Sequence, residues 1–267
     1  TLRPGTFWFS NPEFKTEFRV NSAGIRDNGD SLIKPDVIVL GDSMAMGWGV
    51  NQNETYSEII ERKTGLKVLN AAVSSYGTVR EMLMLKRLDA SNLKYLIVHY
   101  MTNDYLENKF FYEHKNYLEI SSKDTYDHTV NAYLEGKKYY PGKYVIGTLR
   151  QIFFKLKCKV FNIPSSPQDE TDDEAKYFIN ALINASSVVL REVQIIVLSS
   201  KESSFIKALE EEIRNNDYPL YIKNIIPIAM GSKLDRTSYF SLDDHLNRNG
   251  HSIIAQEIIK IIDTNMQ

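Results

Sequence analysis

The chain of 267 residues is predicted to have an α/β fold, in which helices flank a doubly wound parallel sheet. Two features of the sequence support this. Short apolar, β-branched runs alternate with longer segments whose apolar residues recur at helical spacing. The run Val37–Leu40 also stops abruptly at Gly41, which is typical of a central strand in a parallel sheet.

The expected elements alternate along the chain. Residues 36–41 form the first strand, and the helix over 54–65 carries Tyr56, Ile59 and Ile60 at helical spacing before a stop at Gly65. A short strand over 67–71 precedes a helix over 78–88. The strongly apolar segment 95–101 is a further strand. Later elements are helices over 174–192, 202–214 and 249–263, a strand over 194–198, and a segment over 220–228 that contains a strand.

Two regions do not follow this alternation, although the whole chain, 1–267, is interpreted as a single domain. Residues 1–35 are rich in aromatic and polar residues and are expected to form an N-terminal arm. Residues 105–170 are too long for a simple connection, so they are expected to form an insertion, or lid, over the strand ends.

Composition narrows the function classes. The net charge of −2 gives no indication of a nucleic-acid partner. Cys158 is the only cysteine, which excludes an intrachain disulfide and a cysteine-rich zinc site. No apolar run is long enough to span a bilayer. Because the chain begins at Thr1, we expect that an upstream segment, such as a signal peptide or an anchor, has been removed.

Two charged segments have alternative interpretations. Residues 137–160 contain seven Lys or Arg and no acid, and 145–160 has one apolar helical face. This pattern fits an interfacial membrane helix, but an amphipathic helix packed on the domain is favoured. The acidic run 169–174 is interpreted as the start of a helix rather than a calcium site, because it lacks EF-hand spacing.

Ser43 follows the first strand in Gly41-Asp42-Ser43. Ligands of parallel sheets bind beyond the carboxyl ends of the strands, where a serine is placed to act as a nucleophile. The alternative is an ordinary serine after a Gly-Asp turn.

A base is also needed, and His245 lies just before the last helix. Asp243 or Asp244 could accept a hydrogen bond from its ring and fix the tautomer. The alternative is an exposed loop histidine. His251 is expected to be structural, and a metal site built from these histidines and aspartates is disfavoured because the spacing matches no zinc motif.

Two further segments could stabilise an oxyanion. Asn103 follows the strand over 95–101, where its amide could donate a hydrogen bond. The segment from Asn70 to Thr78 has small residues and leads into a helix, so its backbone can approach an anion closely. Both segments are equally compatible with ordinary turns.

The ordered set Gly41-Asp42-Ser43, Asn70 to Gly77, Thr102-Asn103-Asp104 and Asp243-Asp244-His245 resembles the SGNH (GDSL-type) hydrolases. The segment Asn21-Ser22-Ala23-Gly24-Ile25-Arg26, together with Gly47-Trp48-Gly49-Val50, is similar to a bacterial subgroup of that superfamily. The resemblance covers roughly residues 18–104 and 238–263 and implies a three-layer α/β/α, flavodoxin-like fold.

The resemblance also implies roles for individual residues. Ser43 would be the nucleophile and His245 the general base, while the Ser43 backbone N–H and the Asn103 side chain would form the oxyanion hole. Two positions depart from the pattern. Ser75 stands where the superfamily usually has its oxyanion glycine, with Gly77 as the alternative. The usual aspartate three residues before the histidine is Leu242, so Asp243, or else Asp244, is expected to orient the base.

The implied activity is serine-dependent hydrolysis of short acyl esters, chiefly O-acetyl esters of carbohydrates, through an acyl-enzyme and without a cofactor or metal. The alternatives are an O-acetyltransferase for surface polysaccharide and a catalytically idle glycan-binding domain. The expected partner is an acylated small molecule or carbohydrate, with no nucleic acid. Membrane association would occur through a lost N-terminal segment or residues 145–160, and an exported or membrane-anchored bacterial protein is expected.

Overall fold

The computed structural model describes residues 2–119, 121–137, 153, 173–200 and 203–266. The chain divides into two compact units, residues 1–117 with 172–267 and residues 118–171. The single-domain interpretation therefore stays a prediction. The helix predicted over 145–160, apart from Phe153, and residues 169–172 of the acidic run lie outside the described residues.

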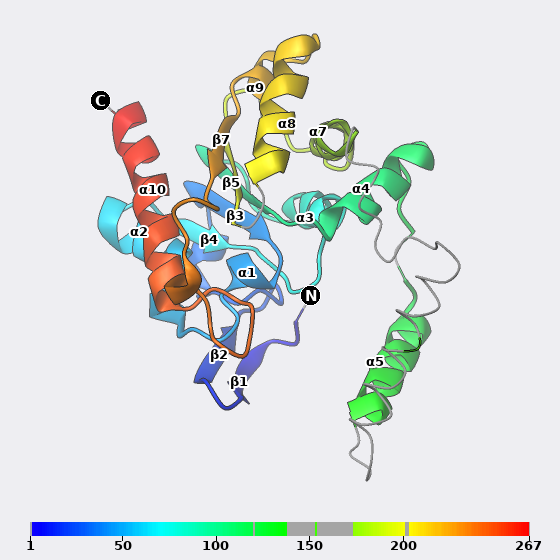
Figure 1. The fold of residues 1–267 in the computed structure, drawn as a ribbon, viewed down its shortest axis with the longest axis vertical. Helices are drawn as coiled ribbons and strands as arrows, with labels where there is room; N and C mark the ends of the chain where they lie inside the picture. Colours follow the sequence, from blue (N-terminus) through cyan, green and yellow to red (C-terminus); the bar gives the residue numbers. More distant parts are fainter. Residues whose placement is uncertain (1, 120, 138–152, 154–172, 201–202, 267) are drawn as a thin grey trace. The chain divides into compact units, whose positions relative to one another are not determined.

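The larger unit is built on a five-stranded parallel sheet, as predicted (Figure 1). Its strands lie in the order β4-β3-β5-β6-β7. β3 and β5 pair from Val37 with Tyr95 to Gly41 with His99, so both strands end at the same edge. The strands are β3 (Val37–Gly41), β4 (Val68–Asn70), β5 (Tyr95–Tyr100), β6 (Gln194–Ser199) and β7 (Ile226–Ala229).

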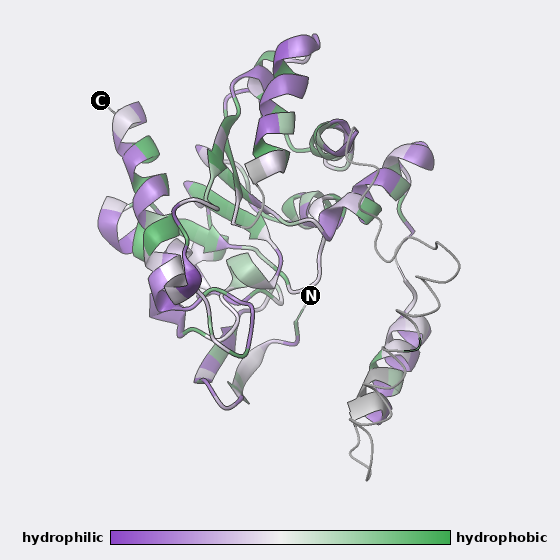
Figure 2. Ribbon diagram, viewed as in Figure 1, coloured by the Kyte–Doolittle hydropathy of each residue, from purple (hydrophilic) through white to green (hydrophobic). Residues whose placement is uncertain are grey.

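Helices cover both faces of this sheet and complete three layers (Figure 1). α2 (Tyr56–Thr64) and α10 (Arg248–Met266) pack together on one face. The other face is covered by α3 (Thr78–Leu85), α4 (Asp104–Glu113), α7 (Glu174–Asn184) and α8 (Ser203–Asn215). Figure 2 shows apolar residues concentrated along the strands, where β3 is completely buried, as burial on both faces requires.

Part of the predicted N-terminal arm forms a hairpin. β1 (Gly5–Ser10) and β2 (Lys15–Val20) pair antiparallel, from Gly5 with Val20 to Ser10 with Lys15. Residues 105–117 of the predicted insertion belong to the larger unit, in which α4 packs against α7. In the smaller unit, α5 (Lys123–Lys137) has almost entirely exposed side chains where they are described.

Two predicted elements differ from the structure. The helix predicted over 174–192 ends at Asn184, because Ser186 caps the following turn by accepting a hydrogen bond from the Val188 amide at 3.2 Å. The segment 220–228 divides into α9 (Leu220–Lys223) and β7. Among the described residues, no helix has both the length and the sustained hydropathy that a membrane span requires.

Candidate active site

The connections reverse direction between β3 and β5, which makes this position the switch point of the sheet. The connection after β3 leads to α2 on one face of the sheet, whereas the connection after β5 leads to α4 on the other. Parallel sheets of this order bind ligands at such a switch point, outside the carboxyl ends of the strands. Ser43 and Asn103 follow these two strands and therefore lie at the same edge.

A tight turn places Ser43 at the end of β3. Ser43 begins the short helix α1 (Ser43–Met46), and the Asp42 carboxylate caps this helix by accepting from the Met44 amide at 2.8 Å. Gly41 has a φ of +152°, and a Cβ at this position would lie 2.5 Å from the Cβ of Ala45. The turn therefore requires glycine immediately before the Asp-Ser pair.

Ser43, His245 and Asp243 form a continuous hydrogen-bonded chain. The Ser43 Oγ lies 2.7 Å from the His245 Nε2. On the other side of the ring, Nδ1 bonds to the Asp243 carboxylate, which also accepts from the His245 amide at 3.1 Å. A carboxylate is an acceptor only, so the bond places the imidazole proton on Nδ1 and leaves Nε2 free to accept the serine proton.

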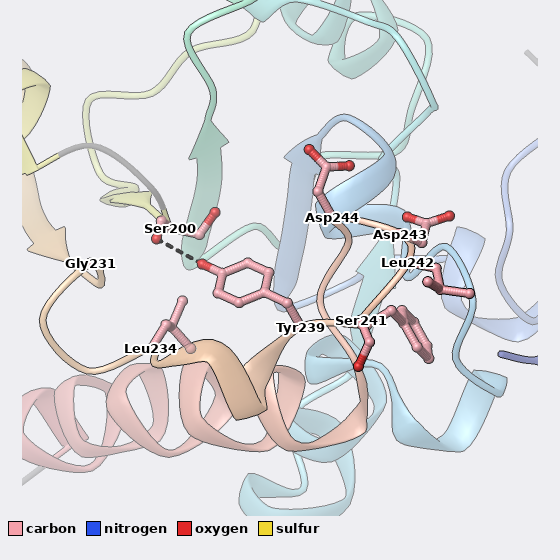
Figure 3. Close-up of a pocket in the computed structure, with 9 residues that line it drawn as sticks. Ser200, Gly231, Leu234, Tyr239, Ser241, Leu242, Asp243 and Asp244 are labelled. Atoms are coloured by element: carbon pink, nitrogen blue, oxygen red, sulfur yellow. Dashed lines mark hydrogen bonds between the residues drawn. The ribbon is translucent and has the colours of Figure 1, made fainter.

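The neighbouring Asp244 occupies a different position. Its carboxylate oxygen is 3.9 Å from the His245 Nδ1, and its side chain is 79% exposed against 21% for Asp243. The two side chains point in different directions (Figure 3). Asp243 is therefore the aspartate that is placed to hold the ring.

The expected oxyanion donors come from two loops at the same edge. The loop after β4 runs beside β3, because the Ala71 amide donates to the Val39 carbonyl at 2.8 Å and the Val73 amide to the Gly41 carbonyl at 3.0 Å. Ser75 follows with a φ of +64°, the left-handed conformation that favours glycine. The side chain of Asn103 is exposed at the start of α4.

Gly77 is the other candidate in that loop. It lies directly before α3 and is buried beside Glu107, whose Oε1 would lie 2.9 Å from a Cβ at this position. Its close packing against Glu107 gives Gly77 a structural reason to be glycine, whereas Ser75 lies at the exposed part of the loop.

Arg26 holds the segment that follows Ser43 by binding its backbone carbonyls. Its buried guanidinium donates to the carbonyls of Met46 at 3.2 Å, of Val50 at 2.6 Å, and of Gly47. It also stacks on the Phe18 ring at 3.7 Å. Burial lowers the pKa of Arg26 to about 10, partly opposed by Glu58, so it stays charged at neutral pH. Sequence reasoning noted the segment around Arg26 but assigned it no contact.

Buried titratable groups lie behind this edge. Burial raises the pKa of the Glu81 and Asp104 carboxyls well above their ordinary values, and the nearby acids raise them further. Burial also lowers the pKa of His99 and of His251 to about 3, so both rings stay neutral. The Nδ1 of His251 accepts from the Tyr56 amide at 3.2 Å, a structural role as expected from the sequence.

The residues that could bind a metal ion include two of those that are hydrogen-bonded to one another at the site. Within the described part of the chain, Asp243, Asp244 and His245 bring potential ligand atoms within 4.8 Å of one another. The atoms of Asp243 and His245 already bond to each other, and the remaining His245 nitrogen bonds to Ser43. This arrangement suits proton transfer better than metal binding.

A cavity of about 480 Å³ adjoins Asp243 (Figure 3). Tyr239 reaches across it to the backbone of Ser200, where its hydroxyl donates to the carbonyl at 3.1 Å. The residues that line the cavity come from the ends of β6 and β7 and from the loop before α10: Ser200, Gly231, Leu234, Tyr239, Phe240, Ser241, Leu242, Asp243 and Asp244.

Comparison with known proteins gives structural likeness only. No family model and no curated protein matches the sequence. Among solved structures, the acetyl xylan esterase Est2A from Butyrivibrio proteoclasticus is 13% identical with a TM-score of 0.51, covering 88% of this chain and 65% of its own. A Bacteroides ovatus protein described as a GDSL-like lipase is 14% identical with a TM-score of 0.47, covering 87% of this chain and 54% of its own.

A member of the lipolytic G-D-S-L family from Veillonella parvula is 13% identical with a TM-score of 0.44, covering 84% of this chain and 96% of its own. The chain thus spans less than two thirds of the length of Est2A and of the Bacteroides protein. The likeness to Est2A, together with the strand order, confirms the predicted three-layer α/β fold with a parallel central sheet.

Proposed function

We propose that the protein is an SGNH-type serine esterase that hydrolyses short acyl esters, chiefly O-acetyl esters of carbohydrates. The observation that carries the proposal is the chain from Ser43 through His245 to Asp243, with the Ser43 Oγ 2.7 Å from Nε2. Nucleophile, base and orienting carboxylate in this order are what acyl transfer by serine requires.

The reaction begins when the Ser43 Oγ attacks the acyl carbonyl carbon and its proton passes to the His245 Nε2. The Asp243 carboxylate stabilises the imidazolium that forms. The Ser43 backbone N–H, the Asn103 amide and the Ser75 N–H, or Gly77 in its place, donate to the tetrahedral oxyanion.

The oxyanion then collapses and the C–O bond to the alcohol breaks. The imidazolium gives its proton to the departing alkoxide, which leaves an acyl group on Ser43. A water molecule next attacks the acyl-enzyme while His245 again takes a proton, and the acid leaves as Ser43 regains its hydrogen. The proton transfers in both halves of the reaction use Ser43, His245 and Asp243, and no step needs a cofactor.

The proposed substrate class is drawn from a protein of the same fold and from the side chains that line the cavity. Est2A, which shares the fold, is an acetyl xylan esterase, and we extend acetylated carbohydrate to this chain as its substrate. The polar and aromatic side chains beside Asp243, including Tyr239 and Ser241, suit a hydroxyl-rich ligand.

The test is hydrolysis of 4-nitrophenyl acetate, butyrate and octanoate by the wild type, by Ser43→Ala and by Ser91→Ala. Ser91 is an exposed serine outside the site and serves as the matched control. We expect acetate to be the best substrate and Ser43→Ala to lose about a thousandfold in kcat/KM. Equal residual rates in the wild type and Ser43→Ala would contradict the proposal.

A further inference from the structure

The turn of the N-terminal hairpin binds the loop that carries Asp243. The Glu13 carboxylate accepts hydrogen bonds from three consecutive backbone amides, those of Ser241 at 2.6 Å, Leu242 at 2.7 Å and Asp243 at 3.0 Å. Glu13 lies far from this loop in sequence but in the same compact unit. A carboxylate that accepts several amide hydrogens is a strong local anchor, because bonds to an ionised acceptor are stronger than neutral ones.

The hairpin itself fixes the position of Glu13. The Asn11 side chain accepts from the Glu13 amide at 2.8 Å and from the Phe14 amide at 3.0 Å, which closes the turn between β1 and β2. The centroid of the Phe14 ring lies 5.1 Å from that of the Phe240 ring and 6.1 Å from that of the Trp48 ring. The carboxylate is therefore held next to the loop by a short and ordered turn.

The residues that Glu13 binds come shortly before His245 in the sequence. Asp243 uses its amide to bind Glu13 and its carboxylate to bind His245. The backbone on the other side of His245 is held separately, because the Phe240 amide donates to the His245 carbonyl at 3.0 Å. Removing the Glu13 carboxylate would leave three adjacent amides without their acceptor and Asp243 free to move relative to the ring.

The hairpin has other attachments that do not involve Glu13. The Phe9 ring packs against the Trp48 ring with their centroids 5.3 Å apart, and Arg26 donates to the Glu17 carbonyl at 3.3 Å. Neutralising Glu13 should therefore change the loop without unfolding the hairpin.

We propose that Glu13 is a positioning residue, which holds the backbone of 241–243 so that the Asp243 carboxylate meets the Nδ1 of His245. This inference rests on the proposed function, because holding Asp243 against His245 matters only if His245 acts as the catalytic base. The hairpin thereby becomes part of the active site.

The first measurement is the low-field proton NMR resonance of the His245 Nδ1–H, assigned by its loss in His245→Ala. We expect it in the wild type and in Glu17→Gln, a matched carboxylate change on the same hairpin, and we expect it broadened or shifted in Glu13→Gln. Glu13→Asp, which keeps the charge but shortens the side chain by one methylene, should give an intermediate signal. It also serves as the test if Glu13→Gln does not fold.

The second measurement is ester hydrolysis by the same variants, with melting temperatures as a check on folding. A misplaced catalytic group lowers the rate of the bound complex, so we expect kcat to fall by about ten- to a hundredfold in Glu13→Gln with little change in KM. Glu17→Gln should stay within about twofold of the wild type.

The outcomes separate the two proposals. An inactive wild type whose resonance still depends on Glu13 would overturn the esterase and support the positioning role. An active wild type with a Glu13→Gln variant of unchanged kcat and resonance would overturn the positioning role alone. Absence of the resonance from the wild type would also overturn it, because the pair would then not be held.

Discussion

The two halves of the active site are built in different ways. The Ser43 half is formed by a buried strand, a glycine that no other residue can replace, and a buried arginine beneath the turn. The His245 half is a partly exposed loop, held by a carboxylate from the hairpin at the start of the chain. The nucleophile is thus positioned by the core of the fold, whereas the base is positioned by long-range contacts at the surface.

The largest expected effect comes from the base itself. His245→Ala should lower kcat/KM by about a thousandfold, because the Ser43 hydroxyl loses its proton acceptor. The melting temperature of the variant is measured in parallel to show that it is folded. Steady-state kinetics with 4-nitrophenyl acetate measures the loss. The control is His114→Ala, which changes an exposed histidine at the C-cap of α4. Comparable losses in both variants would contradict the assignment.

A smaller effect distinguishes the two aspartates of the loop. Asp243→Asn should lower kcat by about a hundredfold or more, because the amide no longer fixes the ring with its proton on Nδ1. Asp244→Asn should lose less than about threefold, as its carboxylate is 3.9 Å from Nδ1 and largely exposed. The kinetics of the two isosteric variants, measured side by side, would refute the geometry if their order were reversed.

In the Ser43 half of the site, the expected effect is on the free energy of unfolding. Arg26→Lys should lower the free energy of unfolding by about 2–3 kcal/mol, because a single ammonium cannot replace a planar guanidinium that serves several carbonyls and a ring. Urea unfolding measures this change. Arg19→Lys on the exposed side of the hairpin should shift it by less than about 0.5 kcal/mol. Equal stabilities of the two variants would show that Arg26 does not support the turn.

The last expected effect is a dependence of stability on pH. Burial keeps the Glu81 carboxyl protonated in the folded state, with a pKa above that of the unfolded chain. Above the unfolded pKa the unfolded state binds fewer protons, so the free energy of unfolding falls as pH rises toward the folded pKa. One such group contributes a slope of about 1.4 kcal/mol per pH unit.

Glu81→Gln replaces the titratable carboxyl group with an amide of nearly the same shape. The slope just above the unfolded pKa, measured by urea unfolding from pH 5 upward, should therefore be shallower in Glu81→Gln than in the wild type. An unchanged slope would mean that Glu81 is ionised in the folded protein.

The comparison also explains what the sequence could predict. The strands, the last helix and the residues beside them were predictable, because apolar runs and turn residues are local signals. Ser43, after a strand, and His245, before the last helix, could therefore be named as candidates. The choice between Asp243 and Asp244 depends on the direction of adjacent side chains, which the sequence leaves open. Glu13 gave no signal at all, because its partners are backbone amides more than two hundred residues away.

The conformation of the loop after β4 could be predicted only in part. Ser75 was noticed as a departure from glycine, and its φ of +64° shows why glycine suits that position. The early end of α7 at Asn184 was also not predicted, because the serine that caps the next turn competes locally with an otherwise continuous helical pattern.

The most direct test of the central claim is labelling with a fluorophosphonate probe, followed by peptide mapping. If Ser43, His245 and Asp243 form a working nucleophilic site, the folded wild type is labelled at Ser43, the denatured protein is not, and His245→Ala is labelled at least about a hundredfold more slowly. A folded wild type that stays unlabelled at Ser43, or that is labelled as fast without His245, would contradict the account.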